Sequence, residues 1–273
     1  RTACRIRTSP RTNATCWKRL YEVGLAIAVR QIRPGGWNRA PRRRGPTPGK
    51  GDALCCMGMC GRYALHSLIT DLQKHFGLFD PIEFTPRFNA APSLSLPIVR
   101  SHGERHELAL CQWGFVPHWM KSRPKTRPIN ARSESVAEKP FFRTALRRRR
   151  CLVAANGFYE WNQSGSPKQP WYFRLADVEI MAFAGLWDSW LHDGKTMETF
   201  AILTTSANDV LRQVHDRMPV ILDPSQYRGG LDAGEQNLLR PYAGRMTGHP
   251  VGRAVNSTAN EGPDLLAPVA NTG

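Results

Sequence analysis

The sequence predicts an α+β domain built on a curved or barrel-like, mostly antiparallel β-sheet with a few flanking helices. Most segments after residue 59 are short, rich in β-branched and aromatic residues, and separated by Gly, Pro, Asn and Asp. Helical spacing of apolar residues is rare, and strands and helices do not alternate regularly along the chain. With 273 residues, of which 41% are hydrophobic, the chain is long enough to bury a sizeable core.

Three helices and six strands account for this pattern. Leu68, Leu72 and Phe76 recur at helical spacing before Gly77, which predicts an amphipathic helix over residues 66–76. Two further helices are expected at residues 140–148 and 207–214. Strands are expected at residues 94–99, 107–113, 151–155, 170–175, 178–184 and 199–205.

The first 58 residues differ in composition from the rest of the chain. They carry 13 Lys and Arg against 2 acidic residues, whereas the remaining residues carry 25 against 20, so most of the net charge of +16 lies at the start. We interpret residues 1–58 as a disordered basic leader. It is either a nucleic-acid-binding arm or upstream sequence translated from a start codon placed too early, and we favour the second origin. Residues 60–256 are expected to form the folded domain and residues 257–273 a C-terminal tail.

Several functional classes are disfavoured by composition. The longest apolar run, at residues 23–29, is far shorter than the roughly 20 residues of a membrane-spanning helix, so we expect a soluble, cytoplasmic protein without a membrane partner. Four of the seven cysteines precede Cys60, and no pair has the CxxC spacing of a zinc or thiol redox site. We therefore expect no metal and no cofactor.

Polar clusters interrupt the expected strands. They are RFNAAP (87–92), WGFVPHW (113–119), INARSES (129–135), NGFYEW (156–161) and HDRMP (215–219). Each cluster sets Asn, Glu, His or Arg beside aromatic residues, Gly or Pro, a composition typical of a site built from loops at the ends of strands.

Together with MCGRY at residues 59–63 and the weaker HPVGRAVN at 249–256, these clusters resemble the SOS-response-associated peptidase (SRAP) family. The resemblance runs from Cys60 to about Asn256, and seven motifs in the family's order are specific evidence, although INAR alone would be weak. It implies the family's fold and the protection of abasic sites in single-stranded DNA as part of DNA repair. It also implies self-processing of the N-terminus.

In that family the initiator Met is removed and the exposed Cys is the reactive residue, which here identifies Met59 and Cys60. An N-terminal Cys holds an amine and a thiol on adjacent carbons, and an α-amino group has an ordinary pKa near 8, so part of it is neutral near pH 7. The amine can form a Schiff base with the abasic-site aldehyde, and the thiol can close a thiazolidine ring. Met57 cannot fill this role because Gly58 follows it. If the preceding residues stay attached, the Cys60 nitrogen is an amide, so translation from Met59, which we favour, or cleavage after it is required.

The resemblance also assigns further catalytic residues. Glu160 matches the family's catalytic acid, and between two aromatic residues its pKa could be raised for proton transfer. His215 matches the catalytic histidine, and Asn130 would hold the Cys60 terminus through uncharged hydrogen bonds. Each also has an ordinary structural interpretation: a solvent-facing strand residue for Glu160, a helix-end hydrogen bond for His215, and a turn cap for Asn130.

DNA-binding residues are expected beside the catalytic group. Arg62, Arg132 and Arg217 are candidate phosphate clamps, because a guanidinium can bind two oxygens at once. Trp113 and Phe115 could stack on bases or wedge beside the lesion. The arginines could equally form a solvated face, and the aromatic residues could belong to the core.

Three functions are therefore compared. The first is covalent capture of abasic sites in single-stranded DNA, with weak lyase activity as a side reaction of the Schiff base. The second is a cysteine-type peptidase that acts on other proteins through Cys60, His215 and Asn130. The third is a noncatalytic single-strand binder. We favour the first, with single-stranded DNA as the partner and a monomer as the working form.

Overall fold

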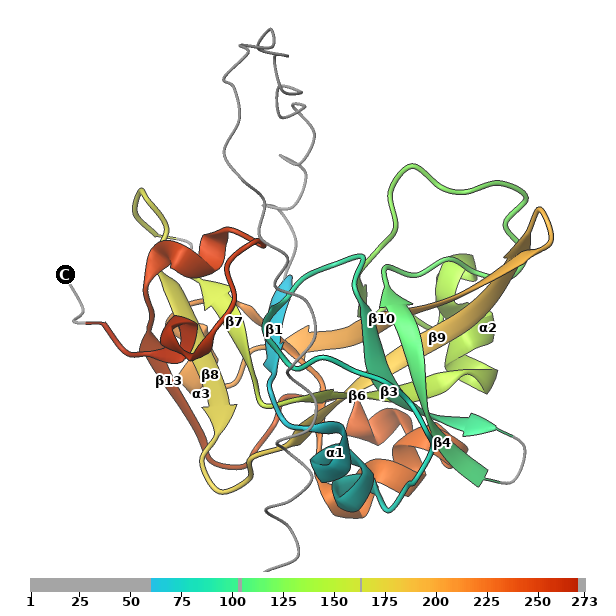
Figure 1. Ribbon diagram of the computed structural model, residues 1–273, viewed down its shortest axis with the longest axis horizontal. Helices are drawn as coiled ribbons and strands as arrows, with labels where there is room; N and C mark the ends of the chain where they lie inside the picture. Colours follow the sequence, from blue (N-terminus) through green and yellow to red (C-terminus); the bar gives the residue numbers. More distant parts are fainter. Residues whose placement is uncertain (1–59, 103–104, 163, 270–273) are drawn as a thin grey trace, which may run out of the picture. The chain divides into compact units, whose positions relative to one another are not determined.

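The computed structural model describes residues 60–102, 105–162 and 164–269. These residues belong to one compact unit, which spans residues 51–273 (Figure 1). The predicted leader at residues 1–58 lies outside the described residues. Within the described part of the chain, no helix has both the length and the apolar character needed to cross a membrane.

The described elements are mostly strands. The helices are α1 (Ile69–Phe76), α2 (Pro140–Arg148) and α3 (Asp209–Arg212), with short helical turns η1 (Pro224–Gln226), η2 (Gly229–Ala233), η3 (Gln236–Leu238), η4 (Arg253–Asn256) and η5 (Pro263–Leu266). The strands are β1 (Arg62–Leu65), β2 (Arg87–Ala90), β3 (Ser95–His102), β4 (Arg105–Trp113), β5 (Asn130–Arg132), β6 (Arg150–Ala155), β7 (Gly157–Trp161), β8 (Pro170–Leu175), β9 (Met181–His192), β10 (Lys195–Ser206), β11 (Arg217–Pro219), β12 (Ile221–Leu222) and β13 (Met246–Pro250).

Five strands close into a small barrel. β10 pairs with β4, β4 with β3, β3 with β6, and β6 with β9, and the pairing of β9 with β10 completes the ring. Only the β10–β4 contact in this ring is parallel, so the barrel is mixed but mostly antiparallel. β5 and β11 attach to the second half of β10, β5 at residues 202–204 and β11 at residues 204–206. The predicted fold class is thereby confirmed.

A second sheet, ordered β13-β8-β7-β1-β2, packs beside the barrel and is antiparallel throughout (Figure 1). Because side chains alternate along a strand, one face of this sheet turns toward the barrel and the other away from it. Tyr63 and Phe158 share a core cluster with barrel residues such as Phe183. Ala64 and Tyr159 belong to a different cluster, which η4 and η5 close from the other side.

The helices and core strands agree with the sequence predictions except at their ends. α2 has the predicted bounds, with Pro140 at a first-turn position that needs no N–H donor. α1 begins three residues later than predicted. α3 is shorter, because Asn208 caps it by accepting a hydrogen bond from the Leu211 N–H, and the helix ends at Arg212.

The prediction that the polar clusters are loops is wrong for four of the five. RFNAAP contributes β2, INARSES contributes β5, NGFYEW contributes β7, and HDRMP contributes β11. Sequence patterns favour apolar residues in buried strands, but these strands bury polar side chains whose hydrogen bonds are satisfied by distant parts of the chain. Asn89, for example, is fully buried and donates to the carbonyls of Ser257 and Asn260.

The segment predicted as a C-terminal tail packs on the domain as far as residue 269. Leu265 is buried in the cluster beneath the outer face of the second sheet. Glu261 accepts a hydrogen bond from the Phe88 N–H, and the Val269 N–H donates to the Pro250 carbonyl. These contacts cover β2 and β13, two strands of the sheet that carries the NGFYEW motif.

Gly157, at the start of β7, sets how closely β8 approaches. A Cβ at this position would lie 2.3 Å from the Tyr172 ring and 2.6 Å from the Phe173 carbonyl oxygen. We expect Gly157→Ala to lower the free energy of unfolding by about 1–3 kcal/mol, because the backbone of β8 must move. Urea unfolding of both proteins measures this, with Gly252→Ala as the control, since a Cβ there meets nothing within 4 Å. Equal losses in the two variants would contradict the packing described for β7.

Candidate active site

Two adjacent strands of the second sheet bring the N-terminal motif to the NGFYEW motif. β1 and β7 pair antiparallel, with Arg62 opposite Tyr159 and Tyr63 opposite Phe158. Glu160 lies two positions after Phe158 and therefore shares its face, which turns toward the barrel. Cys60, two residues before the start of β1, belongs to the same core cluster. The strand register thus places Cys60 and Glu160 together between the sheet and the barrel.

The main-chain nitrogen of Cys60 donates a hydrogen bond of 2.6 Å to Glu160 Oε1. Both residues are buried, with 2% and 3% of their surface exposed. Burial raises the pKa of the Glu160 carboxyl above its usual range, although the charge of His215 and hydrogen bonds from Cys60 oppose this effect. Burial and the neighbouring Glu160 also raise the pKa of the Cys60 thiol well above its usual range. The site therefore favours a protonated thiol and a carboxyl that holds its proton more tightly than an exposed glutamate does.

His215 and Arg217 bring the HDRMP motif to the same place. His215 is close enough to act electrostatically on Glu160, and Arg217 on Cys60. The Arg217 N–H donates to His215 Nδ1 at 3.0 Å, which fixes the ring against the start of β11. The same Nδ1 also lies 3.1 Å from Oδ1 of Asp216. Cys60, Glu160, His215 and Arg217 thus form one cluster.

Arg217 is held by an acidic partner that sequence reasoning left unassigned. Its two terminal nitrogens bind the carboxylate of Glu134 at 2.5 and 2.9 Å, and one of them also donates to the Thr204 carbonyl. The hydrogen bonds from Arg217 hold the pKa of Glu134 below its usual range. Glu134 belongs to the INARSES motif and Arg217 to the HDRMP motif. Their opposite charges, in two motifs expected to lie at one site, were the sequence signal that could have predicted this ion pair. A phosphate that approaches Arg217 would meet a guanidinium whose fork already holds a carboxylate.

Asn130 and Arg132 lie on β5, which pairs in parallel with β10 next to β11. The Asn130 side chain is partly buried, with its Oδ1 shielded from solvent, whereas Arg132 is exposed. Because β5 and β11 both pair with β10, β5 lies close to the cluster of Cys60, Glu160, His215 and Arg217. Contact of Asn130 with the Cys60 terminus stays a prediction.

Trp113 and Phe115 are fully buried in the core rather than exposed on a groove. The Trp113 Nε1–H donates to the Ile129 carbonyl at 2.9 Å, and the Phe115 N–H donates to the Pro128 carbonyl. The structure thus uses both residues to hold the segment that leads into Asn130. With no exposed ring surface, neither side chain offers a platform to a base in this conformation.

Arg62 lies on the opposite face of β1 from the cluster, as the alternation of strand side chains requires. Its guanidinium donates to Asn89 Oδ1 and the Val255 carbonyl at 2.8 Å, and to the Asn256 carbonyl at 3.3 Å. Asn256 also accepts a hydrogen bond from the Trp161 indole N–H at 2.8 Å. These bonds use Arg62 to tie η4 to the sheet.

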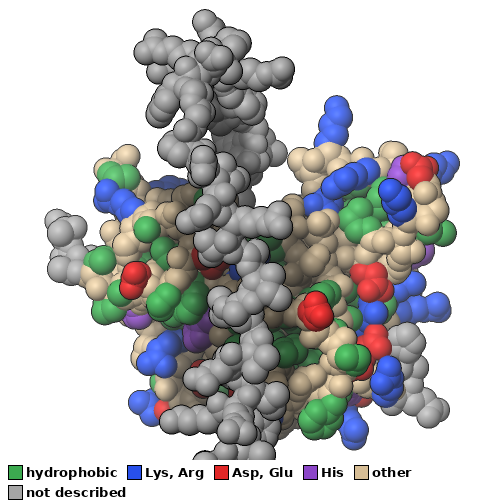
Figure 2. All heavy atoms as spheres, viewed as in Figure 1, with side chains coloured by type: hydrophobic (Ala, Val, Ile, Leu, Met, Phe, Trp, Pro, Cys, Tyr) green, Lys and Arg blue, Asp and Glu red, His purple; other side chains and the backbone are tan. Residues whose placement is uncertain are grey.

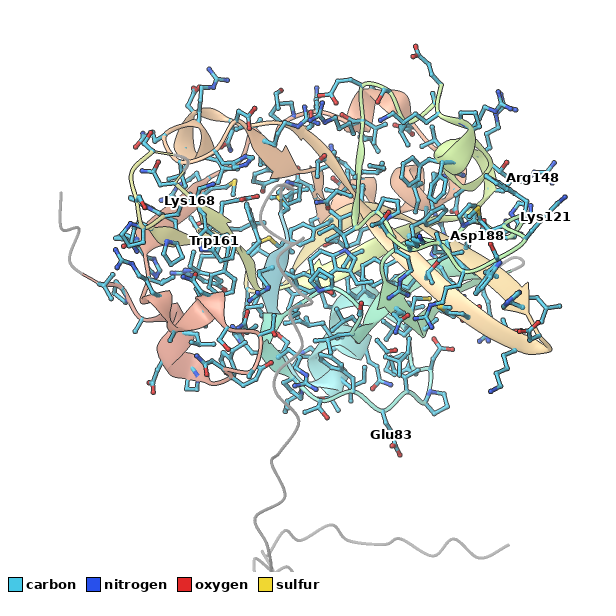
Figure 3. All side chains as sticks on the ribbon, turned by 90° about the horizontal axis from the view of Figure 1, so that it is seen from above. Glu83, Lys121, Arg148, Trp161, Lys168 and Asp188 are labelled. Atoms are coloured by element: carbon cyan, nitrogen blue, oxygen red, sulfur yellow. The ribbon has the colours of Figure 1, made fainter. Side chains whose placement is uncertain are left out.

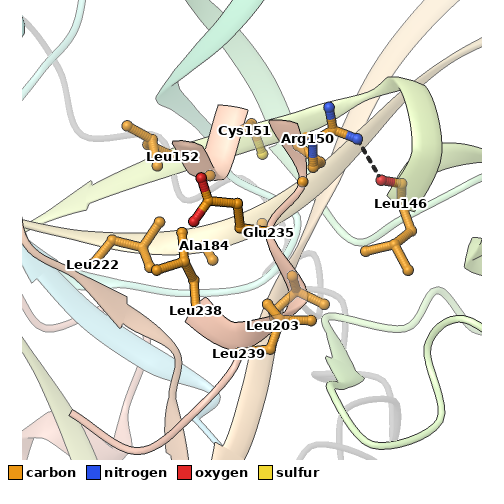
Figure 4. A pocket seen from close by; sticks show the side chains of 13 residues that line it. Leu146, Arg150, Cys151, Leu152, Ala184, Leu203, Leu222, Glu235, Leu238 and Leu239 are labelled. Carbon is orange, nitrogen blue, oxygen red and sulfur yellow. Dashed lines mark hydrogen bonds between the residues drawn. The ribbon is translucent and has the colours of Figure 1, made fainter. Parts of the chain in front are cut away.

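Among the described residues, no group of three or more His, Cys, Asp or Glu is arranged to hold a metal ion. An apolar cavity lies between the barrel and η2 to η3, lined by residues including Cys151, Leu222 and Leu238 (Figure 4). Its volume is about 20 Å³, roughly the space of one water molecule, so it is a packing defect and not a substrate pocket.

The fold is a mixed barrel flanked by an antiparallel sheet, and a cluster of Cys, Glu and His lies between the two. This combination of fold and site is the basis for the comparison with known protein families. The family model described as SOS response associated peptidase (SRAP) matches residues 59–258, and the chain belongs to this family. The resemblance inferred from the motifs is thereby confirmed.

Particular relatives extend this result. Abasic site processing protein YoaM of Bacillus subtilis (strain 168) is 36% identical over 221 residues, which cover 76% of this chain and 97% of the relative. Abasic site processing protein YedK of Escherichia coli (strain K12) is 31% identical over 227 residues, which cover 77% of this chain and all of the relative. A crystal structure of a protein from Bacteroides thetaiotaomicron superposes with a TM-score of 0.71 at 24% identity, covering 77% of this chain and all of that one. The last likeness shows the shared fold.

The raised pKa of Glu160 predicts a specific pH dependence of stability. The folded chain holds the Glu160 proton more tightly than the unfolded chain, so the stabilising contribution is complete below the unfolded pKa. It is lost as pH rises from about 4.3 through the higher folded pKa. We therefore expect the free energy of unfolding of the wild type to fall, relative to Glu160→Gln, over this range. Urea unfolding of the two 273-residue proteins between about pH 4 and about pH 8 tests this, and parallel pH curves would contradict it.

Proposed function

We propose that the protein processes abasic sites in single-stranded DNA by covalent capture through an N-terminal Cys60. The observation that carries the proposal is the 2.6 Å hydrogen bond between the Cys60 nitrogen and Glu160, both buried beside His215. Membership of the SRAP family, and relatives named as abasic site processing proteins, support the same substrate. The proposal requires a chain that begins at Cys60 after removal of Met59.

The proposed reaction is a condensation that releases one water and needs no reactant other than Cys60 and the abasic sugar. The neutral amine of Cys60 attacks the aldehyde carbon of the ring-opened abasic sugar and forms a carbinolamine. Loss of one water gives an imine, and the thiol then adds to the imine carbon, with its proton passing to the nitrogen. The product is a five-membered thiazolidine that joins protein and DNA. The second step is favoured because the thiol is on the adjacent carbon, with a high effective concentration.

Glu160 is proposed to transfer the protons of this sequence. Its Oε1 lies within hydrogen-bond reach of the nitrogen that must lose protons and then regain one. Because burial raises its pKa, the carboxyl gives up a proton less readily than an exposed glutamate and accepts one more readily, which suits a group that must do both in turn. The same carboxyl can accept the thiol proton. This step needs an acceptor because the pKa of the Cys60 thiol is raised, so the thiol otherwise stays protonated.

His215 and the polar residues of β5 and β11 complete the proposed site. His215, held through Nδ1, would protonate the sugar oxygen during ring opening from Nε2. Asn130 is proposed to hold the Cys60 terminus, and Arg132 to contact phosphates next to the lesion. Arg217 would contact a phosphate by exchanging the Glu134 carboxylate that its guanidinium binds in this structure. Arg62, Trp113 and Phe115 are instead given structural roles, because their side chains are already used within the fold.

The thiol environment disfavours a general cysteine peptidase. Such enzymes need a thiol whose pKa is lowered by a neighbouring imidazole, so that a thiolate forms near neutral pH. Here burial and Glu160 raise the Cys60 pKa instead. Peptidase chemistry is therefore proposed only for processing of the protein's own N-terminus. Weak strand cleavage by β-elimination from the imine is expected as a side reaction.

The amine and the thiol can be tested separately. In a chain that begins at residue 60, Cys60→Ala keeps the amine and removes the thiol. We expect this variant to give no stable adduct with an abasic oligonucleotide, but a covalent adduct after borohydride reduces the imine. Denaturing gels with and without borohydride measure both species, with acetylation of the wild-type amine as the control that abolishes both. A stable adduct in the acetylated protein would rule out the proposed nucleophile.

Proton transfer can be tested in the same assay. We expect Glu160→Gln to slow formation of the stable adduct by about 100-fold or more, the usual scale for loss of a positioned acid or base. Because Gln is nearly isosteric, the variant should stay folded, which circular dichroism checks. A rate within about twofold of the wild type would remove Glu160 from the mechanism.

A further inference from the structure

The positive charge of the folded region is concentrated in two segments. Residues 118–127 and 139–150 together carry ten of the 25 Lys and Arg found after residue 58, and none of the 20 acidic residues. The rest of this region therefore has more acidic than basic residues. The motif clusters of the candidate active site do not explain this distribution, because all ten Lys and Arg lie outside them, and only residues 118 and 119 of these segments belong to a cluster.

A buried aspartate joins the two segments. Asp188, on β9, is 1% exposed and accepts hydrogen bonds of 2.9 Å from both the N–H and Nδ1 of His118. Its other oxygen lies 2.9 Å from the guanidinium of Arg149, directly after α2. The His118 side chain remains 40% exposed. Asp188 thus holds one cation and one imidazole side by side at the surface, and it fixes the loop against the helix.

Helix α2 carries a row of like charges that the helix itself does not balance. Lys139, Arg143 and Arg147 recur at four-residue spacing, so they lie along one side of the helix, and Arg148 follows. All four side chains are exposed, and in the described part of the chain none of them forms an ion pair. Like charges at this spacing repel one another and lower the stability of the helix. A bound polyanion would reverse that cost.

The four consecutive arginines at residues 147–150 do not all serve the same purpose: two are bound within the fold and two are exposed. Arg150 donates to the carbonyls of Leu146, Arg147 and Leu231, so it closes the end of α2 and is not available to a ligand. Arg149 binds Asp188. Only Arg147 and Arg148 are exposed and without an acidic partner among the described residues.

The exposed cations gather on one side of the domain. Lys121 and Arg148 lie near Asp188 in Figure 3, at the end opposite Trp161 and Lys168. Figure 2 shows where Lys and Arg side chains lie on one face of the molecule. Contact between the rings of Trp119 and Phe141, with centroids 6.1 Å apart, packs this loop onto the helix. We call this surface the basic face; its residues are His118, Lys121, Arg123, Lys125, Lys139, Arg143, Arg147, Arg148 and Arg149.

We propose that the basic face binds the sugar–phosphate backbone of the DNA strand beyond the abasic site. This inference rests on the proposed function, which brings a DNA strand to the domain. Several cations spread along a helix and a loop match the regular phosphate spacing of a strand better than a single small anion. The half-exposed Trp119 beside these cations favours nucleic acid over an anionic lipid surface, since an aromatic ring can stack on a base. The face would then increase affinity for long strands without taking part in the chemistry.

The test combines strand length with salt dependence. The variant Arg143→Gln/Arg147→Gln/Arg148→Gln removes three cations from the face, and Lys74→Gln/Arg228→Gln/Arg240→Gln removes three exposed cations elsewhere as the matched control. Dissociation constants are measured by fluorescence anisotropy at several salt concentrations. The probes are single-stranded oligonucleotides of about 5 and about 40 nucleotides, each with a stable abasic analogue, chosen to lie below and above the reach of one binding groove.

We expect the face variant to lose about 10- to 100-fold in affinity for the long strand. Its slope of log affinity against log salt should fall by about 2, as loss of three phosphate contacts requires on a single strand. The short strand, and the control variant with both strands, should bind as the wild type does. Equal losses in the two variants, or equal losses for the two strand lengths, would overturn the proposal.

Two further measurements distinguish DNA binding by the basic face from membrane binding, and from failure of the proposed function. Binding of anionic phospholipid vesicles that depends on the same three arginines, with long-strand binding unchanged, would assign the face to a membrane surface and overturn the proposal. Crosslinking of a short abasic oligonucleotide by a chain that begins at Cys60 is measured in parallel. If no variant crosslinks, the proposed function fails, while the salt slope on the long strand still decides whether the basic face binds DNA.

Discussion

The hydrogen bond between the Cys60 nitrogen and the buried Glu160 carboxyl is the constraint on which the site depends. A carboxylate removed from water is costly unless it is paired or protonated, so β7 can carry Glu160 at this position only because partners surround it. Those partners come from three parts of the chain: Cys60 before β1, the Trp161 main chain, and His215 before β11. Two sheets must therefore be assembled before this carboxyl has its full environment.

Strand alternation divides the motif residues of β1 and β7 into two groups with different roles. In β1 and β7, the face with Tyr63, Phe158 and Glu160 turns to the barrel, and the face with Arg62 and Tyr159 turns away. The outer face is fixed by Arg62 and Asn89, whose hydrogen bonds bind η4 and the segment after it. Motifs that resemble one functional cluster in the sequence thus supply both the candidate active site and the scaffold behind it.

The sequence could predict the elements whose patterns are local. Core strands and α2 follow from apolar runs and a Pro at the helix start, and Cys60, Glu160 and His215 follow from motifs whose chemistry is recognisable. The polar strands β2, β5, β7 and β11 were missed because their side chains are satisfied by partners far away in sequence. The burial of Trp113 and Phe115 and the pairing of Glu134 with Arg217 likewise depend on tertiary contacts that no local pattern contains.

The most direct measurement is the intact mass of the protein, beginning at Cys60, after incubation with a single-stranded oligonucleotide that carries one abasic site. Capture by the Cys60 amine and thiol predicts one adduct, heavier by the oligonucleotide less one water, that needs no reductant and maps to Cys60 after digestion. An unmodified mass, or an adduct that maps to a lysine elsewhere in the chain, would contradict the central claim that the Cys60 and Glu160 contact is a reactive site.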